Sequence, residues 1–223
     1  MEGAETGSEA TWQSSPEQGW VAPRVAAEFP GLGIAWVEVD ARPTSSSSEP
    51  VRRRLRDLSD RFYGAHAIHM REQPVPWSYR VFFRQIGLDP DRVRTPAEQL
   101  ALDRLHDGAF LTRGLPADAV TIAIAETCVA LRAYDAARLE GRLCIRESAP
   151  GESLLGYPGQ LEHGTLTIAD ERGPVELLFG GEPECGAERD TRRVAIVAVQ
   201  VKGVPQVAVD EALWIAASML QAA

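Results

Sequence analysis

The sequence predicts an α+β fold rather than a regularly alternating α/β fold. Segments with helical periodicity come early in the chain, and runs rich in β-branched residues cluster late, before one last helical segment. A doubly wound α/β protein would instead alternate strands and helices along its length. We find no internal repeat of the kind that solenoids show. We therefore expect strands drawn mainly from the second half of the chain, with flanking helices.

The composition fits one folded domain with a polar leader. The 223 residues are enough to bury a core without disulfides or metals. Residues 1–18, rich in Gly, Ser, Glu and Thr, predict a flexible leader, and residues 19–223 a single domain. The formal net charge of −9 argues against a globally basic nucleic-acid-binding protein, and DNA is not an expected partner. A local basic patch stays open, because phosphates respond to nearby charge.

Compartment and cofactor signals are weak in this sequence. No apolar run approaches the roughly 18–20 residues of a membrane-spanning helix, and the N-terminus lacks the basic start and apolar stretch of a secretory signal. The three cysteines are an odd number without close spacing, which supports neither a zinc site nor a disulfide framework. We therefore expect a cytoplasmic protein with no membrane partner, no metal and no cofactor.

The first predicted elements are a strand and two helices. A β-rich run at 33–39 follows a Pro-Gly turn signal. Leucine and phenylalanine at helical spacing predict a helix over 51–63. The Pro-Val-Pro segment at 74–76 is expected to break the chain, so the second helix is expected over 78–86.

Two further helices are predicted in the middle of the chain. Thr95 as N-cap, Pro96 in the first turn and Glu98 three residues after the cap predict a helix that runs to about residue 105. The stretch 117–133 is mostly apolar and is expected to be one buried helix.

The late segments predict strands and a closing helix. A helix over 210–222 is expected to pack Trp214 and Met219 into the core. Alternating or β-branched runs predict four strands, at 142–147, 161–170, 174–179 and 193–201.

The segment 178–186 is the strongest candidate for a ligand site. A predicted strand runs into Gly180 and Gly181, and the carboxylate of Glu182 follows. Glycines allow a ligand to approach the backbone closely, and a carboxylate at such a bend can accept a hydrogen bond from a substrate hydroxyl or amine. A hairpin turn with solvated acids is the alternative interpretation of the same residues.

Arginines form the second candidate feature. Arg80 and Arg84 are four residues apart on the second predicted helix, and they could form a phosphate-binding face. A solvated helix face is the alternative. The preceding helix adds five more arginines, at positions 52, 53, 54, 56 and 61.

Standard catalytic and metal signatures are absent from the sequence. It holds no nucleophile elbow, no phosphate-binding Gly-Lys-Ser/Thr loop, no His-Glu-x-x-His and no dinucleotide fingerprint. His66 and His69 are three residues apart but lack an obvious third ligand, which favours ordinary surface or core histidines over a metal pair.

Short blocks occur in an order that is found in one known family. They are FPGL at 29–32, YRVFFRQIGLDP at 79–90, RTPAEQL at 94–100, GLP at 114–116, AYD and LEG within 133–141, GE at 151–152, IAD at 168–170, FGGE at 179–182 and DTRRV at 190–194. By these blocks the chain resembles the B3/B4 domain, the tRNA-editing domain of the bacterial phenylalanyl-tRNA synthetase beta subunit. It resembles the free-standing B3/B4-domain proteins of bacteria more closely, over about residues 29–220.

This resemblance implies layered mixed β-sheets with flanking helices, and a partner that is tRNA or aminoacyl-tRNA. The synthetase domain hydrolyses tyrosine from tRNA for phenylalanine, and its Gly-Gly-Glu carboxylate recognises the tyrosine hydroxyl. By position, Glu182 would be that residue and the catalytic one. The substrate-binding residues would be Phe179, Gly180, Gly181, Glu182 and Thr121, and the tRNA-binding residues Arg80 and Arg84.

The chain also departs from the family pattern. Where the family has Val-Asp-x-x-Asn, this chain has Val-Thr-Ile-Ala at 120–123. The family's Gly-x-Pro motif is replaced by other residues at 128–131, and Arg193 stands where the family's Glu-Thr-x-Asn-Val motif has Asn. Two hypotheses follow: a hydrolase that edits mischarged aminoacyl-tRNA in trans, or a non-catalytic module that binds tRNA or an amino-acid-like small molecule. A recruited enzyme for another ester or amide has no positive support. The amino acid, the tRNA and the oligomeric state stay open.

Overall fold

The computed structural model describes residues 15–42, 44, 46–180 and 185–221. Most of the predicted leader over 1–18 lies outside these residues. Its last two residues form strand β1 (Glu17–Gln18), which pairs antiparallel with β3 (Gly33–Asp40). The described fold therefore begins before the predicted boundary at residue 19.

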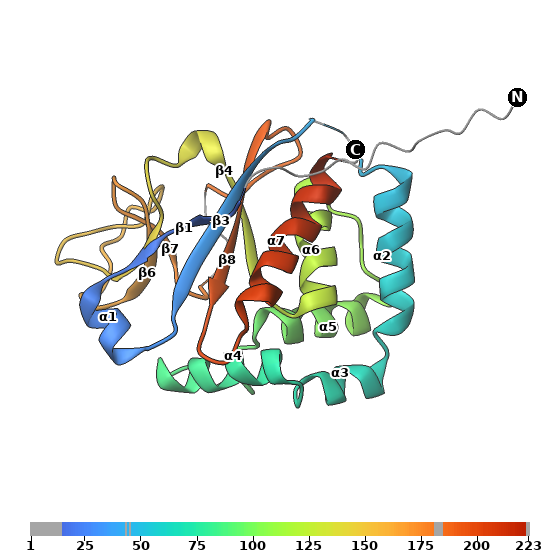
Figure 1. The fold of residues 1–223 in the computed structure, drawn as a ribbon, viewed down its shortest axis with the longest axis horizontal. Helices are drawn as coiled ribbons and strands as arrows, with labels where there is room; N and C mark the ends of the chain where they lie inside the picture. The colour runs from blue at the N-terminus through green and yellow to red at the C-terminus, as the bar shows by residue number, and fades with distance from the viewer. Residues whose placement is uncertain (1–14, 43, 45, 181–184, 222–223) are drawn as a thin grey trace, which may run out of the picture.

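The first sheet is antiparallel, with the order β1-β3-β8-β4. Strand β8 (Arg193–Gln200) pairs with β3 over all eight residues and with β4 (Ala130–Asp135) on its other side. Its β-branched interior is fully buried, because helices cover one face of the sheet and the second sheet lies beyond the other (Figure 1). The strands predicted at 33–39 and 193–201 are confirmed.

The second sheet has the order β2-β5-β6-β7. Strand β2 (Trp20–Val21) pairs parallel with β5 (Cys144–Glu147), and β6 (Leu166–Ala169) and β7 (Pro174–Leu177) add antiparallel strands. The sheet is therefore mixed. With flanking helices around both sheets, the predicted α+β class is confirmed.

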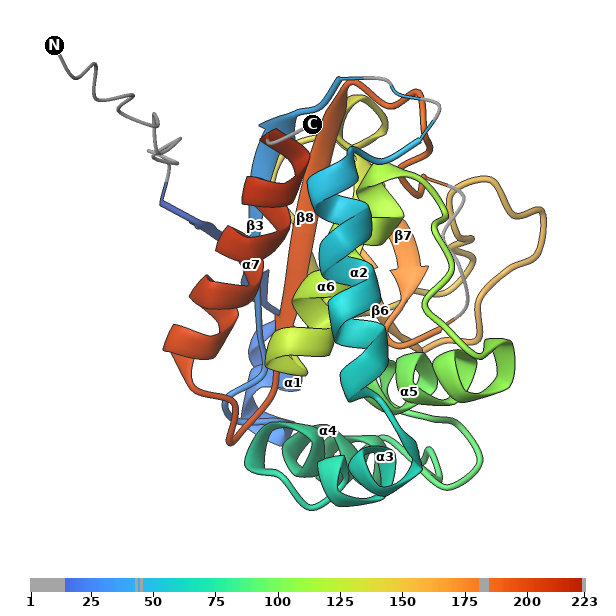
Figure 2. The ribbon, with the colours of Figure 1, turned by 90° about the vertical axis from the view of Figure 1, so that its right-hand side faces the viewer.

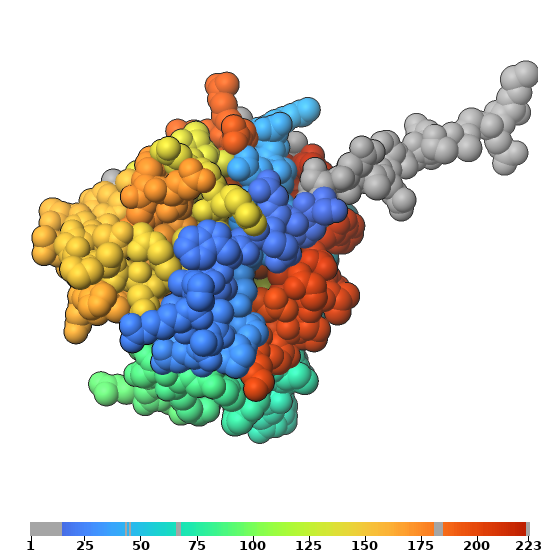
Figure 3. Space-filling model, turned by 60° about the vertical axis from the view of Figure 1, so that its left-hand side comes forward, coloured from blue at the N-terminus to red at the C-terminus, as the bar shows by residue number. Residues whose placement is uncertain are grey.

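Strands β1 and β2 are consecutive in the chain but belong to different sheets. Only Gly19 separates them, and a Cβ there would lie 2.4 Å from the Leu143 carbonyl oxygen, so the position accepts only glycine. This segment and α1 (Pro23–Glu28), blue in Figure 3, lie between the second-sheet region and α7 (Gln206–Gln221).

Helices α6 (Leu115–Thr127) and α7 pack side by side on the first sheet, and α2 (Glu49–Arg61) covers α6 from outside (Figure 2). Buried alanines at 119, 123, 212 and 216 allow the close approach. Met219 packs partly buried against the core, whereas Trp214 is 51% exposed, so the core position predicted for Trp214 is wrong. The described residues cover one face of α7, and Trp214 lies on the other. No described helix is long and apolar enough to cross a membrane.

Three helices lie at one end of the layers: α3 (Gly64–Met70), α4 (Pro74–Gln85) and α5 (Pro96–Asp107). The capping box of Thr95 and Glu98 at the start of α5 is confirmed. The chain break predicted at 74–76 is wrong, because α4 begins at Pro74. The first-turn positions of a helix have no intrahelical N–H partner, so proline is tolerated there.

One buried hydrogen bond joins α4 to β8. The Tyr79 hydroxyl donates to the Val199 carbonyl oxygen at 2.6 Å.

The single helix predicted over 117–133 is also wrong. Helix α6 ends at Thr127, Cys128 adopts a left-handed conformation with φ of 59°, and β4 follows from Ala130. A buried strand and a buried helix are both continuously apolar, so hydrophobicity alone does not separate them. The turn at Cys128 places β4, and with it Arg132, next to β8. A short 3₁₀ helix (Ala136–Arg138) ends this strand.

Candidate functional site

A cavity of about 520 Å³ lies among α5, α6, β4 and the segment after β7. It brings together Thr121, Phe179 and Gly180, three of the predicted substrate-binding residues. The two other predicted residues, Gly181 and Glu182, lie outside the described residues. Segments that are far apart in the sequence therefore meet at one hollow of the size that small-molecule sites have.

The bend after β7 is tightly constrained. Phe179 adopts a left-handed conformation with φ of 59°, which is uncommon for a residue with a bulky side chain. Its ring packs against Tyr79, Phe82 and Phe83, with centroid distances of 6.0, 5.9 and 4.9 Å. At Gly180 a Cβ would lie 2.5 Å from the Leu177 Cβ, so a side chain does not fit. Packing thus holds the chain in a conformation of a kind that is often associated with ligand sites.

Arg132 links this bend to the two sheets. Its Nε donates to Glu176 at 2.9 Å, and its Nη2 donates to the Gly180 carbonyl oxygen at 3.2 Å. The Tyr134 hydroxyl donates to the other carboxylate oxygen of Glu176. Sequence reasoning missed this network because it assigned β4 to a helix. The Arg-x-Tyr alternation at 132–134 would have placed both side chains on one face of a strand.

Glu176 is a buried carboxylate, with only 3% of its side chain exposed. Burial raises the pKa of this carboxyl above its ordinary value of 4.5, and the hydrogen bonds from Arg132 and Tyr134 oppose the shift. The pKa of Tyr134 is raised well above its ordinary value, again first by burial and then by the neighbouring Glu176. The network therefore keeps a proton on Tyr134 and shares Glu176 between two donors.

The Glu176→Gln substitution is expected to remove a pH-dependent part of the stability. A carboxyl whose pKa is raised by folding stabilises the folded state fully below its unfolded pKa, and this contribution is lost as pH rises through the folded value. The unfolding free energy of wild type minus that of Glu176→Gln should therefore fall as pH rises from about 4 upward. Urea unfolding at several pH values measures this difference. A difference that grows with pH would show that Arg132 outweighs burial.

Arg80 and Arg84 do not share one surface. The Arg80 guanidinium is 6% exposed and bonds to Glu98 at 2.6 Å and to Asp91 at 2.8 Å. Arg84 is exposed, and its guanidinium lies 5.8 Å from the ring centroid of Trp77. The structure thus separates the two residues that were expected on one phosphate-binding face. The Arg80 guanidinium is thus already paired with two carboxylates of an ion-pair cluster.

The cavity has a basic lining that the sequence analysis did not identify. Asp103 is the acidic residue among the described residues that line it, against four arginines, which are Arg92, Arg94, Arg113 and Arg132. The local charge is therefore positive on a protein whose formal net charge is −9. The available signal was the pair of arginines at 92 and 94, just before the cap of α5.

Two further hollows extend this cavity toward the start of α6. One of about 350 Å³ shares Arg113, Thr121 and Arg132 with the first. Another, of about 500 Å³, shares Arg113 with both and reaches Arg189. We call the three hollows together the cleft. Its three hollows together offer room for a ligand larger than one amino acid.

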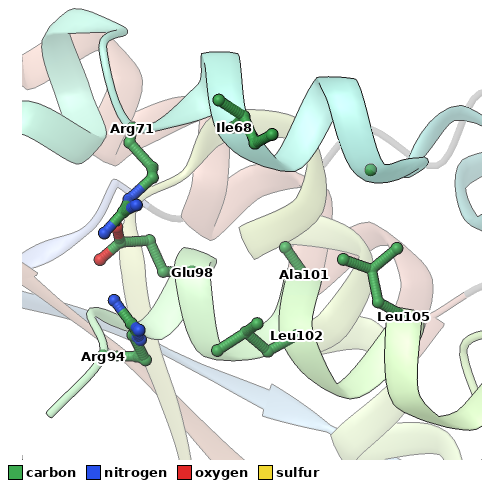
Figure 4. Close-up of a pocket in the computed structure, with 8 residues that line it drawn as sticks. Ile68, Arg71, Arg94, Glu98, Ala101, Leu102 and Leu105 are labelled. Carbon is green, nitrogen blue, oxygen red and sulfur yellow. The ribbon is translucent and has the colours of Figure 1, made fainter. Parts of the chain in front are cut away.

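A further groove of about 310 Å³ lies between α3 and α5 and shares only Arg94 with the first cavity (Figure 4). Its lining is mainly apolar, with Ile68 opposite Leu102 and Leu105. At its polar end Arg71 points toward Glu98 and bonds to it at 2.9 Å. None of the predicted site residues lines this groove. Among the described residues, no three His, Cys, Asp or Glu side chains gather to hold a metal ion, and the side chain of His66 lies outside the described part.

Comparison with known proteins gives a partial relationship. No protein-family model matches the sequence. A segment covering 26% of this chain is 40% identical, over 62 residues, to the phenylalanine–tRNA ligase beta subunit of Paramagnetospirillum magneticum. The chain is thus similar in part to a tRNA ligase subunit. The match spans only 8% of that subunit. The substrate and the reaction are therefore proposed from the site.

Proposed function

We propose that this protein hydrolyses the ester bond of a mischarged aminoacyl-tRNA, and that the amino acid enters the cleft. One observation carries the proposal. The cleft gathers Thr121, Phe179 and Gly180 beside a basic wall, so an amino-acid-sized hollow adjoins a surface suited to phosphates. The partial similarity to a tRNA ligase subunit supports the same substrate class.

The described walls suit an aromatic amino acid. Phe83 and Phe179 supply ring surfaces, and Ile124 adds an apolar side chain from α6. Thr121 supplies a hydroxyl that can donate or accept one hydrogen bond. Aromatic rings pack favourably edge to face, which would orient a tyrosine-like side chain between these walls.

We propose that Glu182 selects the substrate by accepting a hydrogen bond from the tyrosine hydroxyl. The basis is its resemblance to the carboxylate of the family's Gly-Gly-Glu motif. A site built to bond a substrate hydroxyl rejects the analogue without it by about 10⁴–10⁵, because its polar group is then left unpaired. In the reaction, water attacks the ester carbonyl carbon, and the bond to the ribose oxygen breaks. The leaving oxygen takes a proton by way of the neighbouring ribose hydroxyl.

The test is the release of amino acid from purified aminoacyl-tRNA. We expect tyrosine release from tyrosyl-tRNA for phenylalanine to exceed the buffer rate at least tenfold, and phenylalanyl-tRNA to be spared. Glu182→Gln should lower the preference for tyrosine, whereas Glu162→Gln, at an exposed position outside the cleft lining, should not.

Release at the buffer rate across a panel of mischarged tRNAs would overturn the deacylase. If the protein then still bound aminoacyl-tRNA, the result would support the non-catalytic module instead. An unchanged preference in Glu182→Gln, with release intact, would refute the assigned role of that residue alone.

A further inference from the structure

We propose that Arg92 and Arg113 form a phosphate-binding subsite in the cleft and contact the phosphodiesters of a single-stranded RNA end. The proposal rests on the function proposed above, and it assigns the RNA contacts to residues other than Arg80 and Arg84. The two arginines come from different connections, Arg92 from the one between α4 and α5 and Arg113 from the one between α5 and α6. Both line the same cavity.

Both guanidinium groups are free to meet a ligand. Arg92 and Arg113 are exposed, and within the described residues neither side chain makes a hydrogen bond or an ion pair. Other arginines around the cavity have partners: Arg132 bonds to Glu176, and Arg94 lies 3.4 Å from Asp91. The uncompensated positive charge of the lining therefore resides at positions 92 and 113.

The backbone that carries Arg113 is held in place. Its N–H donates to Asp118 at 2.8 Å, and its carbonyl oxygen accepts from Arg189 Nε at 3.0 Å. Asp118 is buried and also accepts from the Ser47 hydroxyl. The next residue, Gly114, has φ of 110°, and a Cβ there would lie 2.6 Å from the Arg189 side chain. The loop is thus fixed while the guanidinium stays unpaired.

The backbone at Arg92 is fixed in a similar way. Its N–H donates to the Asp89 carbonyl oxygen at 2.9 Å. The adjacent Asp91 is bonded by the buried Arg80 at 2.8 Å. The Arg80–Asp91 ion pair therefore ties the loop to helix α4, and Arg92 projects from a held backbone. Preorganisation of this kind lowers the entropy lost on binding.

Guanidinium groups match the geometry of phosphate oxygens and bind them with paired hydrogen bonds. An aminoacyl-tRNA whose amino acid enters the cleft must bring its last phosphodiesters to the cleft as well. Two arginines from different connections that line one cavity can each contact a phosphate of that strand. A free phosphate or mononucleotide would offer the same chemistry, so the experiment separates these sources.

The experiment is the salt dependence of binding, measured by fluorescence anisotropy with a labelled single-stranded RNA that ends in CCA. Each phosphate contact to a single strand contributes about −0.7 to the slope of log K against log salt. We expect Arg92→Gln and Arg113→Gln each to flatten the slope by about 0.7, and the double variant by about 1.4. Arg84→Gln is the matched control, because Arg84 is exposed but does not line the cleft.

Unchanged slopes in both Arg92→Gln and Arg113→Gln, or a flatter slope in Arg84→Gln alone, would overturn the subsite. Inorganic phosphate or adenosine monophosphate can also be added as a competitor, at the concentration at which unlabelled RNA displaces the labelled RNA. If either displaces the labelled RNA equally well, the site binds free phosphate, and the proposed RNA subsite would be overturned. Failure of the deacylase is distinguishable, because amino-acid release can be absent while the slopes change as expected. Conversely, release with unchanged slopes would retain the proposed function and reject the subsite.

Discussion

Replacement of Arg80 by alanine is expected to lower the free energy of unfolding by about 3–5 kcal/mol. The Arg80 guanidinium and the Glu98 carboxylate are 6% and 4% exposed, and their atoms lie 2.6 Å apart. Removal of the cation leaves Glu98 buried, with Arg71 and the capping-box partner Thr95 still bonded to it. Because Arg71 still compensates part of the Glu98 charge, the cost is expected at the lower end of this range.

The Arg84→Ala variant is the control for this prediction. Arg84 is on the same helix but exposed, so the unfolding free energy of the Arg84→Ala protein should stay within about 0.5 kcal/mol of wild type. Urea unfolding of both variants, followed by circular dichroism, gives the comparison. Equal stability of the two variants would show that the ion-pair cluster around Arg80 does not support the fold. If the Arg80→Ala protein loses RNA binding, its unfolding free energy must be measured as well, because the loss could come from unfolding and not from a missing RNA contact.

Replacement of Glu176 by alanine is expected to cost about 3 kcal/mol of unfolding free energy, at the lower end of the range for a broken buried pair. The Tyr134 hydroxyl is buried and loses its acceptor. Arg132 is 36% exposed and can regain water, which limits the cost of its lost partner. The same change frees Arg132 from one of its two contacts and loosens the hold on the Gly180 carbonyl oxygen.

Glu38→Ala offers a matched control on the first sheet. Glu38 pairs with Arg193 at 2.7 Å, but both side chains are largely exposed, so the expected cost is about 0–1 kcal/mol. Thermal or urea unfolding measures both variants. If Glu176→Ala cost no more than Glu38→Ala, the Arg132–Glu176–Tyr134 network would have no role in holding the bend after β7.

The sequence was sufficient where local pattern determines structure. The β-branched run of β8 and the Thr95–Glu98 capping box both formed as predicted, because their signals depend on neighbours a few residues away. The Thr121, Phe179 and Gly180 positions met in one cavity, and the family resemblance was the source of that grouping. Hydrophobic spacing did not contribute to it.

The sequence was insufficient where distant partners determine the outcome. Arg80 and Arg84 share a helix, yet Glu98, in the next helix, decides that only Arg80 is buried. Strand β4 was mistaken for helix because it follows the apolar helix α6 after only two residues, and the apolar run continues into it. Trp214 was placed in the core by its chemistry, but no element of the described residues covers that side of α7.

The short segment 17–21 has a consequence for how the two layers stay together. Strand β1 occupies the outer edge of the first sheet, and β2 occupies the outer edge of the second. One stretch of five residues thus pairs with both sheets, over two residues of each neighbouring strand. This stretch also couples the two sheets mechanically. If one sheet slid over the other, the pairing of this stretch with at least one of them would have to break.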